Sequence, residues 1–348
     1  MKLGFSEQLL AAVPMPLVLI EENEQIGVLN PLATELLGAG LVGRHYSTIL
    51  RQPSVLEAIQ GALMNEEPKT ARFQNRVGDQ EIFYDVKCAM IAGDRSQKHV
   101  LVSFEDVSQL HEADQMRSDF VANVSHELRS PLTSLLGFIE TLRGSARDDT
   151  ETRERFLSIM EREASRMTRL VRDLLSLSRV ESEERVRPNG TVDVRGVIVS
   201  CIQTLEPLTE KTGTIIRLSQ KDEEASLVIG DADQLRQVFI NILENSIKYS
   251  AQGEDINVEI TPMEYDAALR GQAIRIVLSD AGDGIDQIHI PRLTERFYRI
   301  DSHRSREMGG TGLGLAIVKH IVSRHRGRFR ITSKKGQGSQ FTVVLPAA

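Results

Sequence analysis

Two runs of apolar residues at helical spacing dominate the middle of this chain and constrain its fold more than any other feature. The first run consists of Val121, Val124, Leu128, Leu132, Leu135, Ile139 and Leu142, and the second of Phe156, Met160, Ala164, Met167, Val171, Leu174 and Leu177. A polar stretch, 144–150, separates them. Steps of three and four place each run on one face of an α-helix, so 109–185 is predicted to form an antiparallel helical hairpin.

A single hairpin encloses too little interior to be stable alone. Two hairpins packed as a four-helix bundle would bury both apolar faces against each other. The sequence therefore predicts a homodimer whose interface is this bundle.

The 348 residues leave room for a further domain on each side of the hairpin, which predicts a multidomain α+β chain. In the block 1–108, alternation and turn residues predict strands at 16–20, 25–29, 81–90 and 99–105 and a helix at 31–37. The block 186–348 alternates helix and strand and ends in a β-rich segment, 327–345. We predict an α/β sandwich with antiparallel strands there.

Composition excludes several classes of protein. The net charge of -7 gives no basic surface for nucleic acid, so no direct nucleic-acid binding is expected. Cys88 and Cys201 lie far apart and match neither a disulfide framework nor a zinc site. The first apolar run, 9–20, contains Pro14 and Pro16 and is shorter than the roughly 20 residues of a membrane-spanning helix.

The segment 234–249 predicts a helix with one polar row that suits a nucleotide. Its apolar face is followed by Asn241, Asn245 and Lys248, which fall within roughly 60° of arc at 100° per residue. A carboxamide oxygen can ligate Mg²⁺, while an ammonium group neutralises phosphate charge. A solvated polar stripe remains the alternative for this row taken alone.

A second motif follows the predicted strand 274–279. Asp280 shares the parity of the apolar residues of that strand, so its carboxylate is expected to point towards the core and to need a partner. An adenine amino group would serve, with Gly282 and Gly284 allowing the backbone to approach the ring. A calcium loop is excluded because the two glycines stand where ligands would be required.

A third motif, 309–315, reads GGTGLGL and opens a predicted helix that continues to about 322. Gly310, Gly312, Leu313 and Gly314 would present backbone amides to phosphate oxygens. No Lys-Ser/Thr pair follows, so this is not a Walker loop. Between the second and third motifs lies 295–299, ERFYR, which is predicted to belong to a mobile lid.

The order of these motifs is specific. They resemble the asparagine, first glycine, phenylalanine and second glycine boxes of the histidine kinase ATPase domain, which has a Bergerat fold. The stretch 120–131, FVANVSHELRSP, resembles the phosphoacceptor box of the same family. The resemblance spans 109–346, and within the family the chain looks most similar to phosphate-regulon sensor kinases. The block 1–108 resembles a PAS domain, with Asp106-Val107-Ser108 where that family carries Asp-x-Thr.

The resemblance implies a role for each matching residue. His126 would attack the γ-phosphate of ATP, and Glu127 would hold the proton on its other ring nitrogen. Asn245 would ligate Mg²⁺, with Asn241 and Lys248 near the phosphates. Tyr249 would line the nucleotide, and Asp280 would read its adenine. Ser130, one turn after His126, would position water for a phosphatase activity towards the partner.

The same resemblance implies the domain plan and the partners. The plan is a PAS-like sensor domain at 1–108, a dimerisation and phosphotransfer hairpin at 109–185 and an ATP-binding domain at 186–348. The phosphoryl group would pass to an aspartate of a separate response regulator in a bacterial two-component system. The expected location is cytoplasmic, with membrane association left to a partner or to a segment upstream of Met1.

Two other functions stay open. A Bergerat-fold ATPase could drive conformational change without a phosphohistidine, but such enzymes need a glutamate where this chain has Asn241. A scaffold whose PAS-like domain only binds partners would not need a full set of nucleotide boxes.

Several smaller features have ordinary interpretations. The GxGxxG pattern at 38–43 follows a helix, so Gly38 is interpreted as a helix C-cap rather than a dinucleotide motif. His320 and His325 are interpreted as surface residues. The charges at Arg162 and Arg166 are interpreted as a solvated helix face.

Overall fold

The computed structural model describes residues 5–65, 67–78, 80–92, 98–144, 146–183, 186–221, 226–250, 253–300 and 310–348. The chain divides into two compact units, Met1–Ala122 and Asn123–Ala348. Within the described residues, no helix combines the length and the apolar character that crossing a membrane requires.

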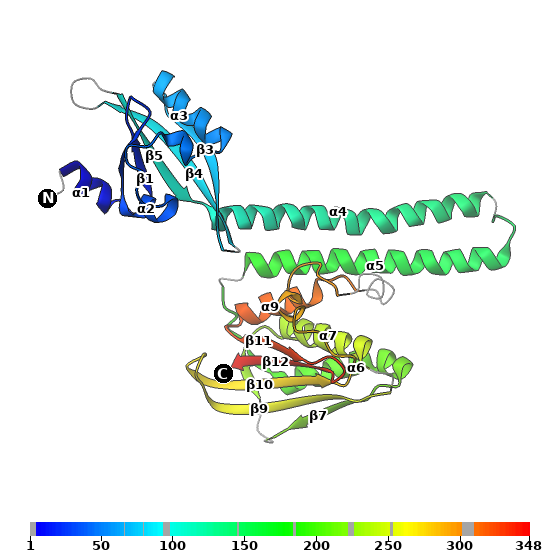
Figure 1. Ribbon diagram of the computed structural model, residues 1–348. Helices are drawn as coiled ribbons and strands as arrows, with labels where there is room; N and C mark the ends of the chain where they lie inside the picture. The colour runs from blue at the N-terminus through cyan, green and yellow to red at the C-terminus, as the bar shows by residue number, and fades with distance from the viewer. Residues whose placement is uncertain are drawn as a thin grey trace. The chain divides into compact units, whose positions relative to one another are not determined.

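The first unit contains a five-stranded antiparallel sheet with short helices (Figure 1). The strand order is β2-β1-β5-β4-β3. The strands are β1 (Leu17–Ile20), β2 (Ile26–Leu29), β3 (Lys69–Val77), β4 (Gln80–Ala92) and β5 (Lys98–Asp106). The helices are α1 (Phe5–Ala12), α2 (Pro31–Leu37), the 3-10 turn η1 (Tyr46–Thr48) and α3 (Pro53–Asn65). This is the PAS-like α+β architecture expected for the N-terminal block.

Alternating side chains build the core of this sheet. Val100, Val102 and Phe104 of β5 are fully buried, together with residues of α3 and the neighbouring strands. The predicted pairing of the first two strands and the predicted helix 31–37 are confirmed. Gly38 ends α2 with φ 104° and donates its N–H to Thr34, as a C-cap does. Helix α3 and strand β3 were not predicted.

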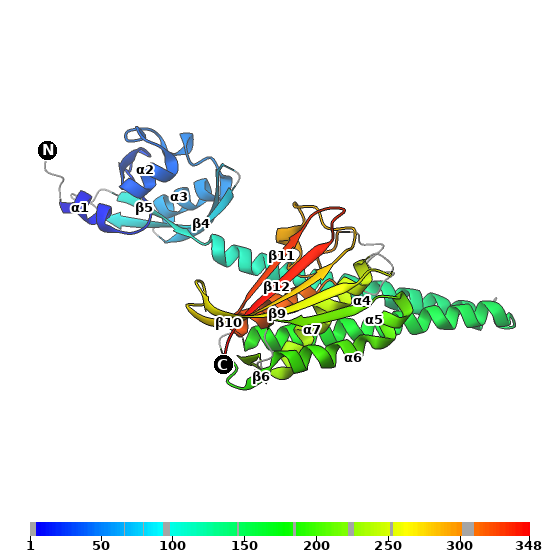
Figure 2. The ribbon, with the colours of Figure 1, turned by 90° about the horizontal axis from the view of Figure 1, so that it is seen from below.

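Two long antiparallel helices form the predicted hairpin. They are α4 (Ser108–Arg143) and α5 (Thr150–Ser182), which lie side by side in Figure 1 and Figure 2. The start of α4 is joined to the end of β5, because Asp106 accepts the N–H of Ser108 at 2.9 Å. Asp149 caps α5 by accepting the N–H of Thr152 at 3.0 Å. The hairpin and its connecting turn are therefore where the apolar periodicity predicts them.

The rest of the second unit is an α/β sandwich. Its sheet has the order β11-β12-β10-β9-β7, and α6, α7 and α9 cover one face of it (Figures 1 and 2). The helices are α6 (Val194–Thr212), α7 (Ala232–Tyr249), the 3-10 turn η3 (Ile290–Arg292) and α9 (Gly314–Arg324). The strands are β6 (Thr191–Asp193), β7 (Ile216–Gln220), β8 (Leu227–Ile229), β9 (Ile256–Asp266), β10 (Gly271–Asp280), β11 (Arg328–Ser333) and β12 (Ser339–Pro346).

One strand differs from the antiparallel prediction. β7 pairs with β9 in parallel, with Ile216 opposite Ile256, while β9, β10, β12 and β11 pair antiparallel. The connection from β7 to β9 runs through α7, and parallel neighbours need such a crossover. Short β6 and β8 form a separate two-stranded sheet.

Candidate nucleotide and phosphoacceptor site

Helix α7 carries the first of the predicted motifs and is fixed by its buried face. All the predicted apolar positions are buried: Leu235, Val238, Phe239, Ile242, Leu243 and Ile247. The side chains of Asn241, Asn245 and Lys248 lie half-buried beside that face. Lys248 Nζ donates to Glu244 Oε2 at 2.7 Å, so it would have to leave Glu244 to reach a phosphate.

Asp280 ends β10 with its carboxylate half-buried against the start of the next turn. Its Oδ1 accepts the N–H of Gly282 at 3.1 Å and the N–H of Ser339 at 3.0 Å. Burial raises the pKa of Asp280 above its ordinary value, although these hydrogen bonds oppose the shift. The apolar residues that share its parity, Ile274, Ile276 and Leu278, are buried as predicted.

The turn after Asp280 packs directly on the end of α7. A Cβ at Gly282 would collide with the carbonyl oxygen of Tyr249, so only glycine allows the two segments to approach this closely. The first glycine motif is thereby placed beside Tyr249, the last residue of α7. Ser339, which holds the Asp280 carboxylate, was not predicted as a site residue, and only its position after a glycine-rich turn hints at such a role.

The third motif meets α7 from the other side. Asn241 Nδ2 donates to the carbonyl of Gly314, the first residue of α9, at 3.1 Å. Thr311 Oγ1 accepts the N–H of Leu313 at 3.3 Å and shapes the loop before the helix. The structure thus brings Gly310–Leu313, Asn241 and Asp280 around one helix, while Gly309 lies outside the described residues.

This arrangement fits a magnesium nucleotide. The Asp280 carboxylate, held through one oxygen, suits recognition of an adenine amino group, and the glycine loop lies beside the asparagine row. The described residues contain no cluster of three or more His, Cys, Asp or Glu side chains able to hold a metal by themselves. Mg²⁺ keeps waters and phosphate oxygens as most of its ligands, and the carboxamide of Asn245 in the asparagine row would supply it with one oxygen.

The phosphoacceptor segment lies on α4. The side chains of His126 and Ser130 are exposed, one helical turn apart. Glu127, by contrast, is largely buried and forms ion pairs with two arginines. Arg166 of α5 donates to Glu127 Oε2, and Arg299 Nη2 donates to the same oxygen at 3.2 Å.

This clamp on Glu127, formed by Arg166 and Arg299, corrects one interpretation made from the sequence. Arg166 is not part of a solvated face, because only 8% of it is exposed. It shares one helix face with the buried Leu170 and Leu177, at steps of four and eleven. That spacing could have predicted the burial of Arg166. It was overlooked because the apolar run through Met167 and Val171 was assigned as the buried face.

Arg299 also belongs to the predicted lid segment. Phe297, two residues earlier, has φ 64° and donates its N–H to the carbonyl of Gly312 at 2.8 Å. The arginine that holds Glu127 is therefore connected through the backbone to the glycine loop. The mobility of this segment stays a prediction, and 301–309 lie outside the described residues.

A row of polar contacts joins α5 to the sandwich. Asp173 Oδ2 accepts the hydroxyl of Thr311 at 2.7 Å, and Ser176 donates to Gln237 at 2.8 Å. Burial raises the pKa of Asp173, with the Thr311 hydrogen bond opposing the shift. Further along α5, Glu181 pairs with Arg296 at 2.6 Å. None of these α5 residues was predicted from the sequence as part of the site.

The interpretation of His325 as a surface residue is wrong. Its side chain is fully buried at the end of α9 and is hydrogen-bonded on both ring nitrogens. His320 is half-buried and lies 3.4 Å from Glu181.

Comparison with known proteins agrees with this geometry. Residues 230–348 match the family model of histidine kinase-, DNA gyrase B- and HSP90-like ATPases, and residues 116–183 match the His Kinase A phosphoacceptor domain. Together the two segments make up more than half of the chain.

Similar curated proteins are sensor kinases. The chain is 40% identical over 253 residues to the phosphate regulon sensor protein PhoR of Pseudomonas aeruginosa, covering 73% of this chain and 55% of that protein. It is 39% identical over 241 residues to the sensor protein kinase WalK of Staphylococcus saprophyticus, covering 69% of this chain and 38% of that protein. The chain thus spans about half the length, or less, of these relatives.

One solved structure extends the likeness to nearly the whole fold. The histidine kinase ThkA, in its complex with the response regulator TrrA, superposes with a TM-score of 0.51 at 22% identity and covers 99% of both chains. At this identity the likeness concerns the fold alone. The matched phosphoacceptor and ATPase segments, together with the similarity to curated sensor kinases, show that this chain belongs to the sensor histidine kinases.

Proposed function

We propose that this protein transfers the γ-phosphoryl group of ATP to His126 and then to an aspartate of a response regulator. The supporting observation is the convergence of Asn241, Asp280 and the Gly310–Gly314 loop around α7, in the same compact unit as His126. The alternative of an ATPase without phosphohistidine would need a glutamate to activate water at the position of Asn241, whose carboxamide instead donates to the glycine loop.

In the proposed reaction, one ring nitrogen of His126 attacks the γ-phosphorus. The bond from that phosphorus to its bridging oxygen breaks, ADP leaves with the electron pair, and a nitrogen–phosphorus bond forms. ATP supplies the phosphoryl group, and Mg²⁺ held by Asn245 would neutralise charge on the phosphate oxygens. The protein contributes mainly positioning and charge, as phosphoryl transfer requires.

The other residues would bind and orient. Asp280 accepts the adenine amino group, Asn245 offers its carboxamide oxygen to the metal, and Lys248 exchanges Glu244 for phosphate oxygens. Glu127 would orient His126 by holding the proton on its second ring nitrogen. For that step Glu127 must leave the clamp of Arg166 and Arg299 described above.

A second activity rests on Ser130. Its hydroxyl lies one turn after His126 on the same exposed face. We propose that it positions a water for removing phosphate from the response regulator. Its hydroxyl can make the same hydrogen bonds as a threonine, but it lacks the methyl group that would restrict its rotation.

The partners follow from the same proposal. Apolar residues of the hairpin, such as Leu132 and Ile139, are 50% and 40% exposed, which supports a homodimer that buries them. The similarity to a phosphate regulon sensor supports a role in phosphate-starvation signalling, while comparable identity to WalK leaves the signal open to direct test. We also propose that the sensor, phosphotransfer and ATP-binding domains meet after residues 108 and 185.

The test is phosphorylation with γ-labelled ATP and Mg²⁺. We expect an acid-labile, alkali-stable label on the native chain, none on His126→Gln, and a loss of more than about a hundredfold for Asn245→Ala. His45→Gln and Asn257→Ala serve as matched controls, because both residues lie outside the site. Hydrolysis of ATP without label, unaffected by His126→Gln, would overturn the kinase and favour the ATPase alternative.

A further inference from the structure

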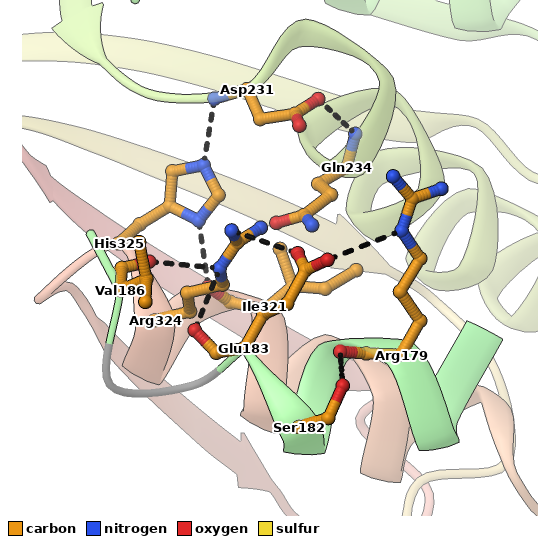
Figure 3. A network of polar contacts seen from close by, with 9 residues as sticks. All are labelled: Arg179, Ser182, Glu183, Val186, Asp231, Gln234, Ile321, Arg324 and His325. Carbon is orange, nitrogen blue, oxygen red and sulfur yellow. Dashed lines mark hydrogen bonds and ion pairs between the residues drawn. The ribbon is translucent and has the colours of Figure 1, made fainter. Parts of the chain in front are cut away.

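Two adjacent residues at the end of α9 point to different elements of the second unit. Arg324 is turned to the end of α5, and His325 is turned to the start of α7 (Figure 3). Both are buried, with 8% and 0% of their surfaces exposed. We call this pair the α9 joint.

Arg324 holds the end of the hairpin. Its Nε donates to the carbonyl of Glu183 at 3.1 Å and to the carbonyl of Val186 at 3.0 Å. Its Nη2 lies 2.9 Å from the Glu183 carboxylate. Glu183 is the C-cap of α5, so one buried cation satisfies the carbonyl groups where that helix ends.

His325 holds the start of the nucleotide helix. Its Nε2 accepts the N–H of Asp231 at 3.0 Å, while its Nδ1 donates to the carbonyl of Ile321 at 2.8 Å. Both bonds together require the neutral ring with its proton on Nδ1. Asp231 in turn is the N-cap of α7 and accepts the N–H groups of Asp233 and Gln234.

The backbone at Gly230 packs closely against the imidazole ring of His325. A Cβ at Gly230 would lie 2.8 Å from His325 Cδ2 and 3.0 Å from Nε2. The residue before the α7 cap is therefore a glycine because the imidazole occupies the space of its side chain. The position of His325 and the start of α7 are fixed against each other.

Helix α7 carries Asn241 and Asn245, so whatever fixes its start also fixes the register of the proposed nucleotide ligands. Arg324 is the last residue of α9 and His325 is its C-cap, so a displacement of the hairpin end would be passed to the start of α7 through two adjacent residues. We infer that the α9 joint is a positioning device that aligns the nucleotide helix with the end of the phosphoacceptor hairpin.

This inference rests on the proposed phosphotransfer, but part of its test does not. In the full-length chain, hydrogen exchange is measured for the amides of the last turn of α5 and the first turn of α7. Arg324→Gln removes the ion pair with Glu183 and alters no residue of α7. We expect faster exchange at both ends by about tenfold, whereas Arg330→Gln on an exposed strand position should change neither.

The kinetic part separates positioning from nucleotide binding. For Arg324→Gln we expect the rate of His126 labelling at saturating ATP to fall about tenfold or more, and the KM for ATP to rise by a smaller factor, because the nucleotide-binding side chains are kept while their helix loses its alignment with the hairpin. Glu183→Gln should reproduce part of this loss. The double variant should be no worse than Arg324→Gln, because the two side chains act as one pair.

His325 supplies the second variant. A glutamine carbonyl can accept the Asp231 N–H as Nε2 does, whereas leucine fills the space without accepting it. His325→Gln should therefore keep more of the labelling rate than His325→Leu, with both chains folded by circular dichroism. Equal loss in the two variants would contradict the hydrogen-bonding role.

The outcomes are distinguishable. If exchange in Arg324→Gln rises only at the end of α5 and the labelling rate is unchanged, the positioning role of the α9 joint is contradicted, while the proposed phosphotransfer to His126 is unaffected. If exchange rises at both ends but the native chain carries no phosphohistidine, the proposed function fails and the mechanical connection stands.

Discussion

Glu127 is held in ion pairs in the structure, although the proposed reaction needs it to contact His126. It neighbours the proposed nucleophile His126, yet in the structure its carboxylate is held by Arg166 and Arg299, whose side chains are 9% and 6% exposed. Such largely buried pairs are costly to break from one side, because the remaining charge loses its partner. The clamp is therefore a stabilising feature and also a barrier to the catalytic role that we propose for Glu127.

Replacing Arg166 tests the stabilising part. We expect Arg166→Gln to lower the free energy of unfolding by about 2 kcal/mol, less than a full unpaired charge because Arg299 stays. Urea denaturation of the native chain and the variant measures this difference. Arg162→Gln, at an exposed position of the same helix, should cost less than about 0.5 kcal/mol. Equal effects of the two substitutions would show that the clamp contributes nothing.

His325 predicts a pH dependence of stability. Burial lowers the pKa of this imidazole below its ordinary value of 6.5; nearby Asp231 opposes the shift, and Arg324 and Arg187 add to it. The unfolded chain therefore binds this proton more readily than the folded chain, so stability falls as the pH drops below about 6.5. Thermal unfolding at pH 7.5 and 5.5 should show this loss, and His325→Gln should show a smaller one.

At the scale of elements, the two hairpin helices present different faces. Helix α5 uses Asp173, Ser176 and Glu181 towards the sandwich, while α4 leaves Val121, Leu132 and Ile139 substantially exposed. Exposed apolar residues at helical spacing are what a second hairpin would cover.

Placing a charge on that face tests the dimer. We expect Ile139→Glu to weaken self-association by more than about a hundredfold, because an unpaired carboxylate would be buried in the bundle at a cost of several kcal/mol. Sedimentation velocity of the native chain and the variant at matched concentrations measures this. Thr133→Glu, at an exposed polar position, should leave the dimer intact. A dimeric Ile139→Glu chain would place the interface elsewhere.

Elements with strong periodicity could be predicted from the sequence, and long-range polar partners could not. The hairpin, α7 and the parity of Asp280 follow from local apolar patterns. Arg166, Asp173 and His325 are indistinguishable by pattern from surface polar residues, because their burial depends on segments more than ninety residues away or on the other hairpin helix. The parallel pairing of β7 was missed for a similar reason, since one short strand carries no signal of its partner's direction.

At the scale of the whole molecule, the first unit is closed on itself. Its core cluster runs from Val18 to Phe104 and is continuous within one sheet and its helices. The described contacts of the nucleotide site all lie in the second unit. We therefore predict that nucleotide binding by the second unit survives removal of the first.

We expect the fragment 109–348 to bind ATP with an affinity within about twofold of the full chain, since distant independent parts contribute additively. Isothermal titration of both proteins with a non-hydrolysable ATP analogue measures this. The control is the full chain with Asn245→Ala, which should lose magnesium-dependent affinity. Loss of nucleotide binding in the fragment would mean that 1–108 helps to build the site.

The polar row on α5 has a consequence for how a signal could release the sandwich. Asp173, Ser176 and Glu181 lie on one side of a single helix. A rotation of that helix as a rigid body would therefore break their contacts with the sandwich together. A rotation of α5 about its own axis by one residue step, about 100°, would carry the whole row away at once. We therefore expect the three contacts to be lost together when α5 rotates about its axis, so that release of the sandwich is all-or-none rather than graded.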